Sequence, residues 1–323
     1  MIIGYHASHE QFSPSALLTY VKAAEDAGFE ATMTSDHIAP WSARQSNSGN
    51  NWAWLGAAMA STSLPFGSLA IPGGWRYHPA VLAHLVATLG EMFPGRLPWI
   101  AVGSGEAVNE RVVGEQWPGK EERNRRLQAG AEVMRSLLKG EKVTVDDPDI
   151  ATVEARLWSL PATAPALFGA ALSEKTAQWM GAWADGLITV PKPKPELEKI
   201  LRAFQANGGK GKPLALQLQV SWAGSKQEAR IAAWDQWRHI AAPSQSLAQF
   251  ERPEDFDASV RDVRPEEMDD LIPLIDRSDE LVAIIRDYAS LGFREIYIHN
   301  VSRDQLGFIR FMKDQVLPAL REG

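Results

Sequence analysis

The fold is decided by residues 97–110, LPWIAVGSGEAVNE. Residues 97–102 form a short apolar run after a Pro94-Gly95 turn, a pattern typical of a buried strand. Gly103-Ser104-Gly105 carries almost no side chain, so a flat ligand can approach its backbone closely. Glu106 then stands at a strand-to-helix turn, which in α/β proteins faces the ligand-binding crevice. The competing interpretation is a carboxylate that only stabilises the start of a helix.

Outside this stretch, short apolar runs alternate with helical segments along the whole chain. Three joints have a helix, then a glycine (Gly28, Gly186 or Gly292), then a β-branched run. Strands are expected at 2–6, 31–34, 65–71, 97–102, 165–169, 187–190, 214–220 and 295–299. This alternation predicts a parallel sheet wrapped by helices, and eight strands favour a closed (β/α)8 TIM barrel. A doubly wound open sheet is the alternative.

The domain organisation follows from the two stretches that break this rhythm. Residues 142–160 contain short β-like pieces, and residues 241–277 are rich in proline and acidic residues. A chain of 323 residues can form one barrel-sized domain. We therefore expect a single barrel domain over 1–323, with insertions near 142–160 and 241–277.

Composition excludes several classes of function. The chain has 33 Lys and Arg against 40 Asp and Glu, a net charge of −7, which argues against nucleic acid or an anionic membrane as the main partner. It has no cysteine, so thiolate metal sites and cysteine nucleophiles are excluded. The histidines show no HxH or HxxxH spacing, so no metal site is expected. There is no signal-peptide pattern and no membrane-length apolar run. We expect a cytoplasmic protein, a homodimer, that acts on a small molecule.

Polar residues gather after the predicted strands, at the face where (β/α)8 enzymes carry their active sites. The opposite ends carry plain glycine turns. The residues that follow the predicted strands at this face include His6, Ser8, His9, Gln11, Ser35, Asp36, His37, Trp41, Gly73, Gly74, Trp75, Arg76, His78, Ser104, Glu106, Asn109, Ser173, Lys192, Lys194, Trp222, Ser225, His299, Asn300 and Arg303. The asymmetry predicts that one mouth of the barrel is the active site.

His37 is the first candidate for proton transfer, because imidazole titrates near neutral pH. Glu106 is the expected complementary acid or base, with its pKa raised if the site is dry. Asp36 is adjacent in sequence, but neighbours along a strand point to opposite faces, so it need not orient His37. The competing interpretation of His37 is a hydrogen-bonded loop histidine.

Several other residues are candidates for binding. Trp41, Trp75 and Trp222 could wall a flat cofactor or a sugar ring, or could be ordinary core. Ser173 heads a predicted helix and could bind a phosphate through its hydroxyl and the free backbone N–H groups, or could be a plain N-cap.

Three motifs in order carry a family resemblance: Ser35-Asp36-His37 with Trp41, then residues 75–80 (WRYHPA), then residues 103–110 (GSGEAVNE). Together they resemble the bacterial luciferase-like superfamily, and within it the F420-dependent glucose-6-phosphate dehydrogenases. The resemblance implies a (β/α)8 barrel with a flavin or deazaflavin at its mouth. It implies that His37 abstracts a substrate proton, that Glu106 is the second acid/base, and that Trp41 packs beside the reacting centre.

The resemblance also implies a set of binding residues. The positions that match cofactor contacts are Asp36, Leu69, Ala70, Ser104, Gly105, Asn109, Ala171 and Ser173, with Leu69-Ala70 at the bulge under the ring. The substrate contacts are expected at Trp75, Lys192, Lys194 and Trp222.

This chain departs from the family pattern at three places. Pro193 stands where the family has a phosphate-binding lysine, and residues 241–277 offer no clear counterpart of its two other basic groups. Ala171-Leu172 replaces a glycine pair near the cofactor phosphates. These departures leave FMN and F420 both open as the cofactor. They favour a neutral or weakly anionic polar substrate.

The sequence thus predicts an oxidoreductase that moves a hydride between a small polar alcohol or carbonyl, sugars included, and a flavin or deazaflavin. An FMN-dependent luciferase-like monooxygenase is one alternative. A non-catalytic flavin-binding barrel is the other, although the presence of both His37 and Glu106 argues against it.

Overall fold

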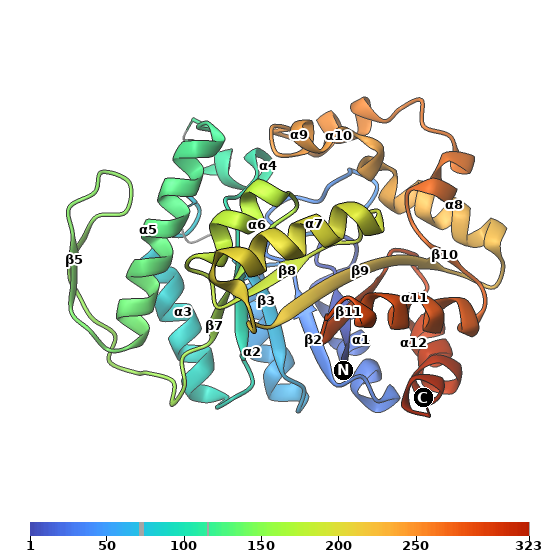
Figure 1. Ribbon diagram of the computed structural model, residues 1–323, viewed down its shortest axis with the longest axis horizontal. Coiled ribbons are helices and arrows are strands. Elements are labelled where there is room, and N and C mark those ends of the chain that lie inside the picture. Colours follow the sequence, from blue (N-terminus) through green and yellow to red (C-terminus); the bar gives the residue numbers. More distant parts are fainter. Residues whose placement is uncertain (71–73, 115, 323) are drawn as a thin grey trace.

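A computed structural model describes residues 1–70, 74–114 and 116–322. Within these residues, parallel strands run in the order β9-β11-β1-β2-β3-β4-β7-β8, and a further pairing of β8 with β9 closes the ring (Figure 1). An open sheet would leave two unpaired edges, so this closure rules out the doubly wound alternative. The predicted (β/α)8 TIM barrel is confirmed.

The eight barrel strands of the described chain agree with the predicted strands to within two residues at each end. They are β1 (Ile2–Ala7), β2 (Ala31–Thr34), β3 (Phe66–Ala70), β4 (Trp99–Val102), β7 (Ala166–Ala170), β8 (Gly186–Thr189), β9 (Leu214–Trp222) and β11 (Glu295–Asn300). Strand β4 begins two residues late because Pro98 has no N–H to donate; its carbonyl still accepts from the Ala166 amide at 3.0 Å. Ile71, the expected end of the third strand, and Gly73 lie outside the described residues.

Helices cover the outside of the barrel (Figure 1). The helices that the structure describes outside the second irregular stretch are α1 (Pro14–Ala27), α2 (Asn51–Ser61), α3 (Pro79–Met92), α4 (Ala107–Glu110), η1 (Arg111–Val113), α5 (Lys120–Leu138), α6 (Glu174–Gly181), α7 (Lys194–Phe204), η2 (Gln205–Gly209), α8 (Lys226–Trp237), α11 (Ser278–Ser290), α12 (Gln305–Phe311), η5 (Met312–Val316) and α13 (Leu317–Arg321). Helix α1 shows why such segments have sharp ends. Ser13 caps it by accepting from the Ala16 amide, and Gly28 ends it with a φ of 93°. None of the helices described is both long and apolar enough to cross a bilayer.

The two stretches expected as insertions have irregular structure. The first contains an antiparallel hairpin of β5 (Val143–Val145) and β6 (Thr152–Ala155). The second follows η3 (Arg238–Ala241) and contains α9 (Ser244–Leu247), α10 (Pro253–Ser259), η4 (Pro265–Asp270) and β10 (Leu274–Ile275). Strand β10 pairs in parallel with the end of β9. The Ala107 amide donates to the Ala248 carbonyl at 3.2 Å, so this segment contacts α4 at the barrel mouth. The single-domain organisation with two insertions stays a prediction.

Large side chains fill the inside of the barrel. Trp99 stacks on Phe168 with a centroid distance of 5.2 Å, and Tyr297 packs edge-on against Trp99 at 5.5 Å. A Cβ at Gly67 would lie 2.0 Å from the Trp99 ring, so only glycine permits this approach. The filled interior leaves the mouth at the carboxyl ends of the strands as the place for a ligand.

Candidate active site

The carboxyl ends of β1, β2 and β4 bring three ionisable side chains together. His37 Nδ1 lies 2.7 Å from Glu10 Oε1, and His37 Nε2 lies 3.8 Å from Glu106 Oε2. The side chains of His37 and Glu10 are 12% and 2% exposed, against 33% for Glu106. The imidazole is therefore held between a buried carboxylate and one that a ligand can reach.

The three charges shift one another's pKa. Burial disfavours the charged form of His37 and so lowers its pKa. The charge and hydrogen bond of Glu10, together with the charge of Glu106, outweigh this effect of burial, and the pKa of His37 is raised. Burial also works against charge on Glu10, yet the contact with His37 holds its pKa well below the ordinary value. Burial raises the pKa of Glu106, and His37 offsets only part of this. Glu10 thus stays an anion, while the other two groups titrate at higher pH than they would in water.

Glu10 is a site residue that the sequence reasoning missed. It stands between His9 and Gln11, which were noted only for their place after the first strand. Its carboxylate also accepts from Ser8 Oγ at 2.7 Å. The available signal was topological: β1 pairs with β2, so a carboxylate after β1 lies beside a histidine after β2.

Trp41 lies next to His37, as expected for a residue near the reacting centre. Its ring packs edge-on against His37 at 4.7 Å and stacks on His239 at 5.7 Å. Phe256 of α10 contacts it from another side at 5.5 Å. The second irregular segment therefore helps to fix Trp41 in the mouth.

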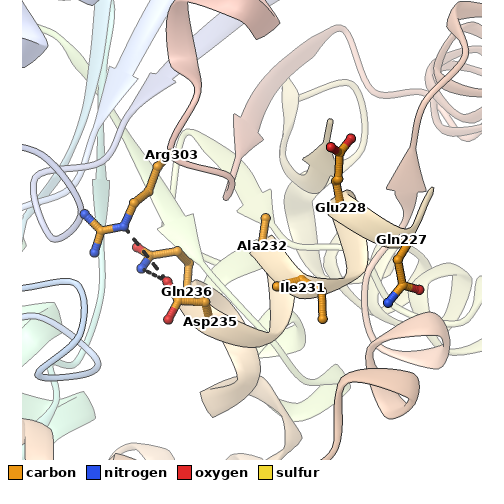
Figure 2. A pocket seen from close by; sticks show the side chains of 7 residues that line it. All are labelled: Gln227, Glu228, Ile231, Ala232, Asp235, Gln236 and Arg303. Carbon is orange, nitrogen blue, oxygen red and sulfur yellow. Dashed lines mark hydrogen bonds and ion pairs between the residues drawn. The ribbon is translucent and has the colours of Figure 1, made fainter. Parts of the chain in front are cut away.

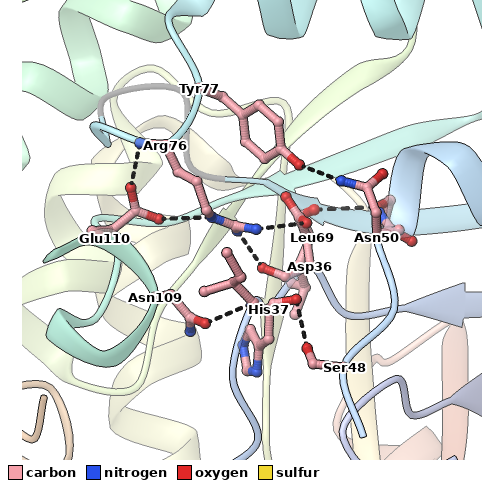
Figure 3. A network of polar contacts seen from close by, with 12 residues as sticks. Asp36, His37, Ser48, Asn50, Leu69, Arg76, Tyr77, Asn109 and Glu110 are labelled. Carbon is pink, nitrogen blue, oxygen red and sulfur yellow. Dashed lines mark hydrogen bonds and ion pairs between the residues drawn. The ribbon is translucent and has the colours of Figure 1, made fainter. Parts of the chain in front are cut away.

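Asp36 takes part in a network with Arg76 and Glu110 (Figure 3). Arg76 donates from Nη1 to Asp36 Oδ1 at 3.3 Å and from Nη2 to the Asp36 carbonyl at 2.7 Å. Glu110 Oε2 accepts from the amides of Trp75 and Arg76 at 2.9 and 3.0 Å. Burial raises the pKa of both Asp36 and Glu110, and Arg76 opposes the shift. The network anchors the loop after β3; a contact of Asp36 with the cofactor stays a prediction.

Asn109 connects the segment that carries His37 to Glu106. Its Oδ1 accepts from the Ile38 amide at 3.0 Å, and its Nδ2 donates to Glu106 Oε2 at 3.2 Å (Figure 3 shows the first of these). Gly105, just before Glu106, has a φ of 76°, which favours glycine. Ser104 Oγ accepts from Lys120 Nζ at 2.6 Å.

The lining of the mouth differs between its two sides. Alternation along the strands turns Leu69 of β3 and Ala170 of β7 toward the barrel axis, and Leu69 is only half-buried. Gly103 directly follows β4 and carries no side chain. On the side of β1 and β11, His6 and His299 pack at 4.4 Å between centroids. The first side, where side chains are aliphatic or lacking, is the candidate surface for a flat ring. Ala70 and Ala171 are buried, and the Ala171 amide already donates to the Ile188 carbonyl at 3.1 Å.

Some residues predicted to bind the substrate contact other protein side chains instead. Trp222 stacks on Phe311 of α12 at 5.2 Å, in the apolar layer outside the barrel, so core packing accounts for it and the proposed site does not include it. Lys194 pairs with Asp287 of α11 at 2.8 Å. Both lysines are engaged with acids, since Lys192 lies 3.7 Å from Glu196.

Trp75 and Ser173 also have protein partners. Trp75 packs against Trp117 at 5.6 Å, and the Arg126 guanidinium lies 4.0 Å from its ring centroid. Ser173 caps α6 by accepting from the Thr176 amide at 3.4 Å. The N-cap interpretation of Ser173 therefore holds, and its phosphate contact stays a prediction.

A separate hollow of about 410 Å³ lies along α8 (Figure 2). Its lining residues are Gln227, Glu228, Ile231, Ala232, Asp235, Gln236 and Arg303. The Arg303 Nε to Asp235 Oδ2 distance is 4.0 Å, and no predicted site residue except Arg303 lines the hollow. It is open to solvent on the helical layer, whereas the histidine and its two carboxylates are at the barrel mouth.

Comparisons with known proteins agree with this geometry. A family model described as luciferase-like monooxygenase matches residues 3–295. The F420-dependent glucose-6-phosphate dehydrogenase of Beutenbergia cavernae is 32% identical over 99% of this chain and 97% of that protein. The enzyme of the same name from Nakamurella multipartita is also 32% identical, over 98% and 96%. A solved F420-dependent secondary alcohol dehydrogenase, in complex with an F420-acetone adduct, superposes with a TM-score of 0.89 over 99% of both chains at 27% identity.

Proposed function

Since the chain belongs to the luciferase-like monooxygenase family, we propose that it is an oxidoreductase that transfers a hydride between a small polar alcohol or carbonyl and a flavin-type cofactor. The names of its relatives favour F420 as that cofactor, with FMN as the second candidate. The observation that carries the proposal is the placement of His37 between Glu10 and Glu106 at the barrel mouth.

The residues present fit such a cofactor. The half-buried Leu69, the glycines around Ser104, and Ala170 give its ring an aliphatic surface, and the filled interior keeps it at the mouth. When bound, F420 or FMN accepts or donates the hydride. The protein supplies the binding surface and the groups that move protons.

His37 is the proposed base in alcohol oxidation. A hydride leaves an alcohol carbon readily only if the hydroxyl proton leaves too, and a positioned base contributes on the order of 10²–10⁴ in rate. Glu10 binds Nδ1 of His37, which leaves Nε2 to accept the proton. The Glu10 charge then stabilises the protonated ring. Glu106, whose pKa is raised, serves as the second proton donor or acceptor 3.8 Å away.

The substrate we propose is neutral or weakly anionic. Lys192 and Lys194, the basic residues expected near a substrate phosphate, face Glu196 and Asp287. A small alcohol needs no cation of this kind, only a place beside His37 and Trp41. A hexose phosphate that turned over far faster than the free hexose would contradict this substrate class.

Anaerobic stopped-flow spectroscopy tests the function. The protein is mixed with F420 or FMN and then with secondary alcohols or glucose under nitrogen, and the absorbance of the oxidised cofactor is followed. We expect the absorbance to fall in a substrate-dependent phase. Oxidation of substrate only by reduced FMN and oxygen would favour the monooxygenase. Saturable binding without either reaction would favour a non-catalytic barrel.

Assembly and location complete the proposal. The enzyme works as a homodimer in the cytoplasm on small molecules, without nucleic-acid or membrane partners. Light scattering coupled to size-exclusion chromatography checks the dimer: a mass of about 36 kDa, the mass of one chain, would contradict it.

A further inference from the structure

The second irregular stretch lies at the barrel mouth, where it contacts two loops of the candidate active site. At one point the Ala248 carbonyl accepts at 3.2 Å from the amide of Ala107, the residue after Glu106. At another, Phe256 of α10 packs against the ring of Trp41. Figure 1 shows α9 and α10 at the same end of the barrel as α4. The stretch therefore connects the loop after β4 with the loop after β2.

Asp257, the next residue of α10, binds three consecutive residues of the loop after β2. Its Oδ1 accepts from Ser42 Oγ at 2.7 Å, and its Oδ2 accepts from the Ala43 amide at 3.1 Å. Arg44 Nη1 lies 2.7 Å from Oδ1. Ser42 is fully buried, and the side chains of Arg44 and Asp257 are only 25% and 21% exposed. Both carboxylate oxygens thus hold one turn, through charge-assisted contacts that a neutral side chain would weaken.

Helix α10 is itself fixed in place, so it can serve as an anchor. At its start the Asp255 carboxylate accepts from the Arg252 amide at 3.0 Å. Phe256 and Val260 are buried, on either side of Asp257 along the chain. The helix therefore presents the Asp257 carboxylate from a rigid support.

The rest of the turn is bound to α8. The Trp41 amide donates to Gln45 Oε1 at 3.0 Å, and Gln45 Nε2 donates to the Gln236 carbonyl at 2.9 Å. Arg44 Nε donates to the Asp235 carbonyl at 2.8 Å. The backbone that follows Trp41 is therefore held by α8 on one side and by α10 on the other.

The Trp41 ring depends on this turn for its position. It packs edge-on against His37 with a centroid distance of 4.7 Å, and its other contacts include the apolar cluster that contains Trp237, Met268 and Ile272. A displacement of about 1 Å at a reacting centre can lower a rate on the order of 10²-fold. The turn after Trp41 can thus influence the reaction without touching the substrate.

We propose that Asp257 is a positioning residue: by holding the turn 42–44 it sets the Trp41 ring at the place where the alcohol is expected. The inference rests on the proposed function. The cofactor ring is expected on the other side of the mouth, against Leu69 and Ala170. Loss of Asp257 should therefore impair the use of the alcohol and spare the binding of the cofactor.

A double-mutant cycle with Trp41 tests the proposal. Asp257→Ala should lower kcat/KM for the alcohol by about tenfold or more, while the Kd of F420 or FMN stays within about twofold of wild type. In a Trp41→Ala background the same substitution should lower kcat/KM by less than about threefold, because no ring is left to position. Asp262→Asn, exposed in the same stretch, is the control and should change neither quantity.

Fluorine NMR of the cofactor-free chain gives a readout that does not depend on turnover. The protein is labelled with 5-fluorotryptophan, and the Trp41 resonance is the one that Trp41→Ala removes. Asp257→Ala should shift this resonance. The resonance of Trp99, which lies inside the barrel and is identified by Trp99→Phe, should stay in place. If Asp257→Ala does not fold, Asp257→Asn, which keeps the shape and loses the charge, replaces it in both experiments.

The outcomes separate the two proposals. Equal losses of kcat/KM in the two backgrounds would overturn the positioning role, since Asp257 would then act independently of Trp41. An unmoved Trp41 resonance would overturn it as well, and so would an equal loss of cofactor affinity, which would mark a general loss of structure. A folded wild-type chain that reduces neither cofactor with any alcohol overturns the proposed function, and with it the role in the reaction. The fluorine resonance then still decides whether Asp257 holds Trp41.

Discussion

His37 is chemically defined by what surrounds it. A lone loop histidine would titrate near its ordinary pKa and contact water. Here one ring nitrogen lies 2.7 Å from a buried carboxylate and the other faces Glu106, with the Trp41 ring at its side. This arrangement fixes the tautomer that a base needs and stabilises the charge that the base acquires.

Removal of either proton-transfer group should slow turnover. His37→Ala and Glu106→Gln are each expected to lower single-turnover cofactor reduction by on the order of 10²–10⁴ at saturating substrate. Cofactor affinity should stay close to wild type. Glu106→Gln should also keep the melting temperature, whereas His37→Ala should lower it, because Glu10 is then buried without its partner. If both variants reduce the cofactor at the wild-type rate, the acid/base assignment is wrong.

Glu10→Gln tests the positioning role of Glu10 through pH. Glu10 raises the pKa of His37, so the neutral substitute should lower that pKa. His37 must be neutral to accept a proton, and the acid limb of the kcat profile for alcohol oxidation should therefore move to lower pH. The plateau rate should also fall, because the protonated ring loses its counter-charge. Glu91→Gln, on the exposed side of α3, is the matched control. An unmoved acid limb would argue against the positioning role.

Among the structural elements, the loop after β3 depends on charges far away in sequence. The side chain of Arg76 is 9% exposed, and those of Asp36 and Glu110 are 1% exposed. The arginine therefore joins the end of β2 to α4 through the loop that carries Trp75. Such a buried cluster stabilises a conformation only while all its members are present.

Arg76→Met should destabilise the protein by about 3 kcal/mol or more, because it leaves Asp36 and Glu110 buried without their cation. Adding Glu110→Gln to this variant should cost less than it does in the wild type, since the lost pairing is shared. Urea unfolding of the two single variants and the double variant measures this coupling. Strictly additive costs would show that the network is not energetically connected.

For the whole molecule, closure of the barrel buries several histidines around the mouth. Burial lowers the pKa of His6 and of His9 to about 4, and that of His239 to about 3. In the unfolded chain these groups protonate near 6.5. Between these values the unfolded state binds more protons, so each histidine makes folding less favourable as the pH falls.

His239→Phe isolates one such contribution while keeping an aromatic ring beside Trp41 and Trp237. The unfolding free energy of the wild type relative to the variant should fall as the pH drops from 6.5 toward 3, by up to about 1.4 kcal/mol per pH unit. Above pH 7 the difference should be constant, because the histidine is then neutral in both states. Urea unfolding at several pH values checks this; parallel curves for the two proteins would contradict it.

The resemblance found in residues 35–41, 75–80 and 103–110 is confirmed by the family match, and the barrel is confirmed by the closed sheet. The strands and helices of the barrel were predictable because strand alternation, helix caps such as Ser13 and terminal glycines such as Gly28 act within a few residues. The location of His37 and Glu106 at one mouth was also predictable, because the carboxyl ends of parallel barrel strands all lie at the same face.

The sequence by itself therefore determined the eight strands, the face that carries the site, and the pairing of a histidine with a carboxylate after β4. Only the tertiary structure decided that Glu10 holds His37, that Arg76 joins Asp36 to Glu110, and that Trp222 and Lys194 turn to α12 and α11. These contacts join segments that lie tens of residues apart in the sequence. They depend on the register of neighbouring strands and on side-chain direction at their ends, and no local pattern of residues encodes either.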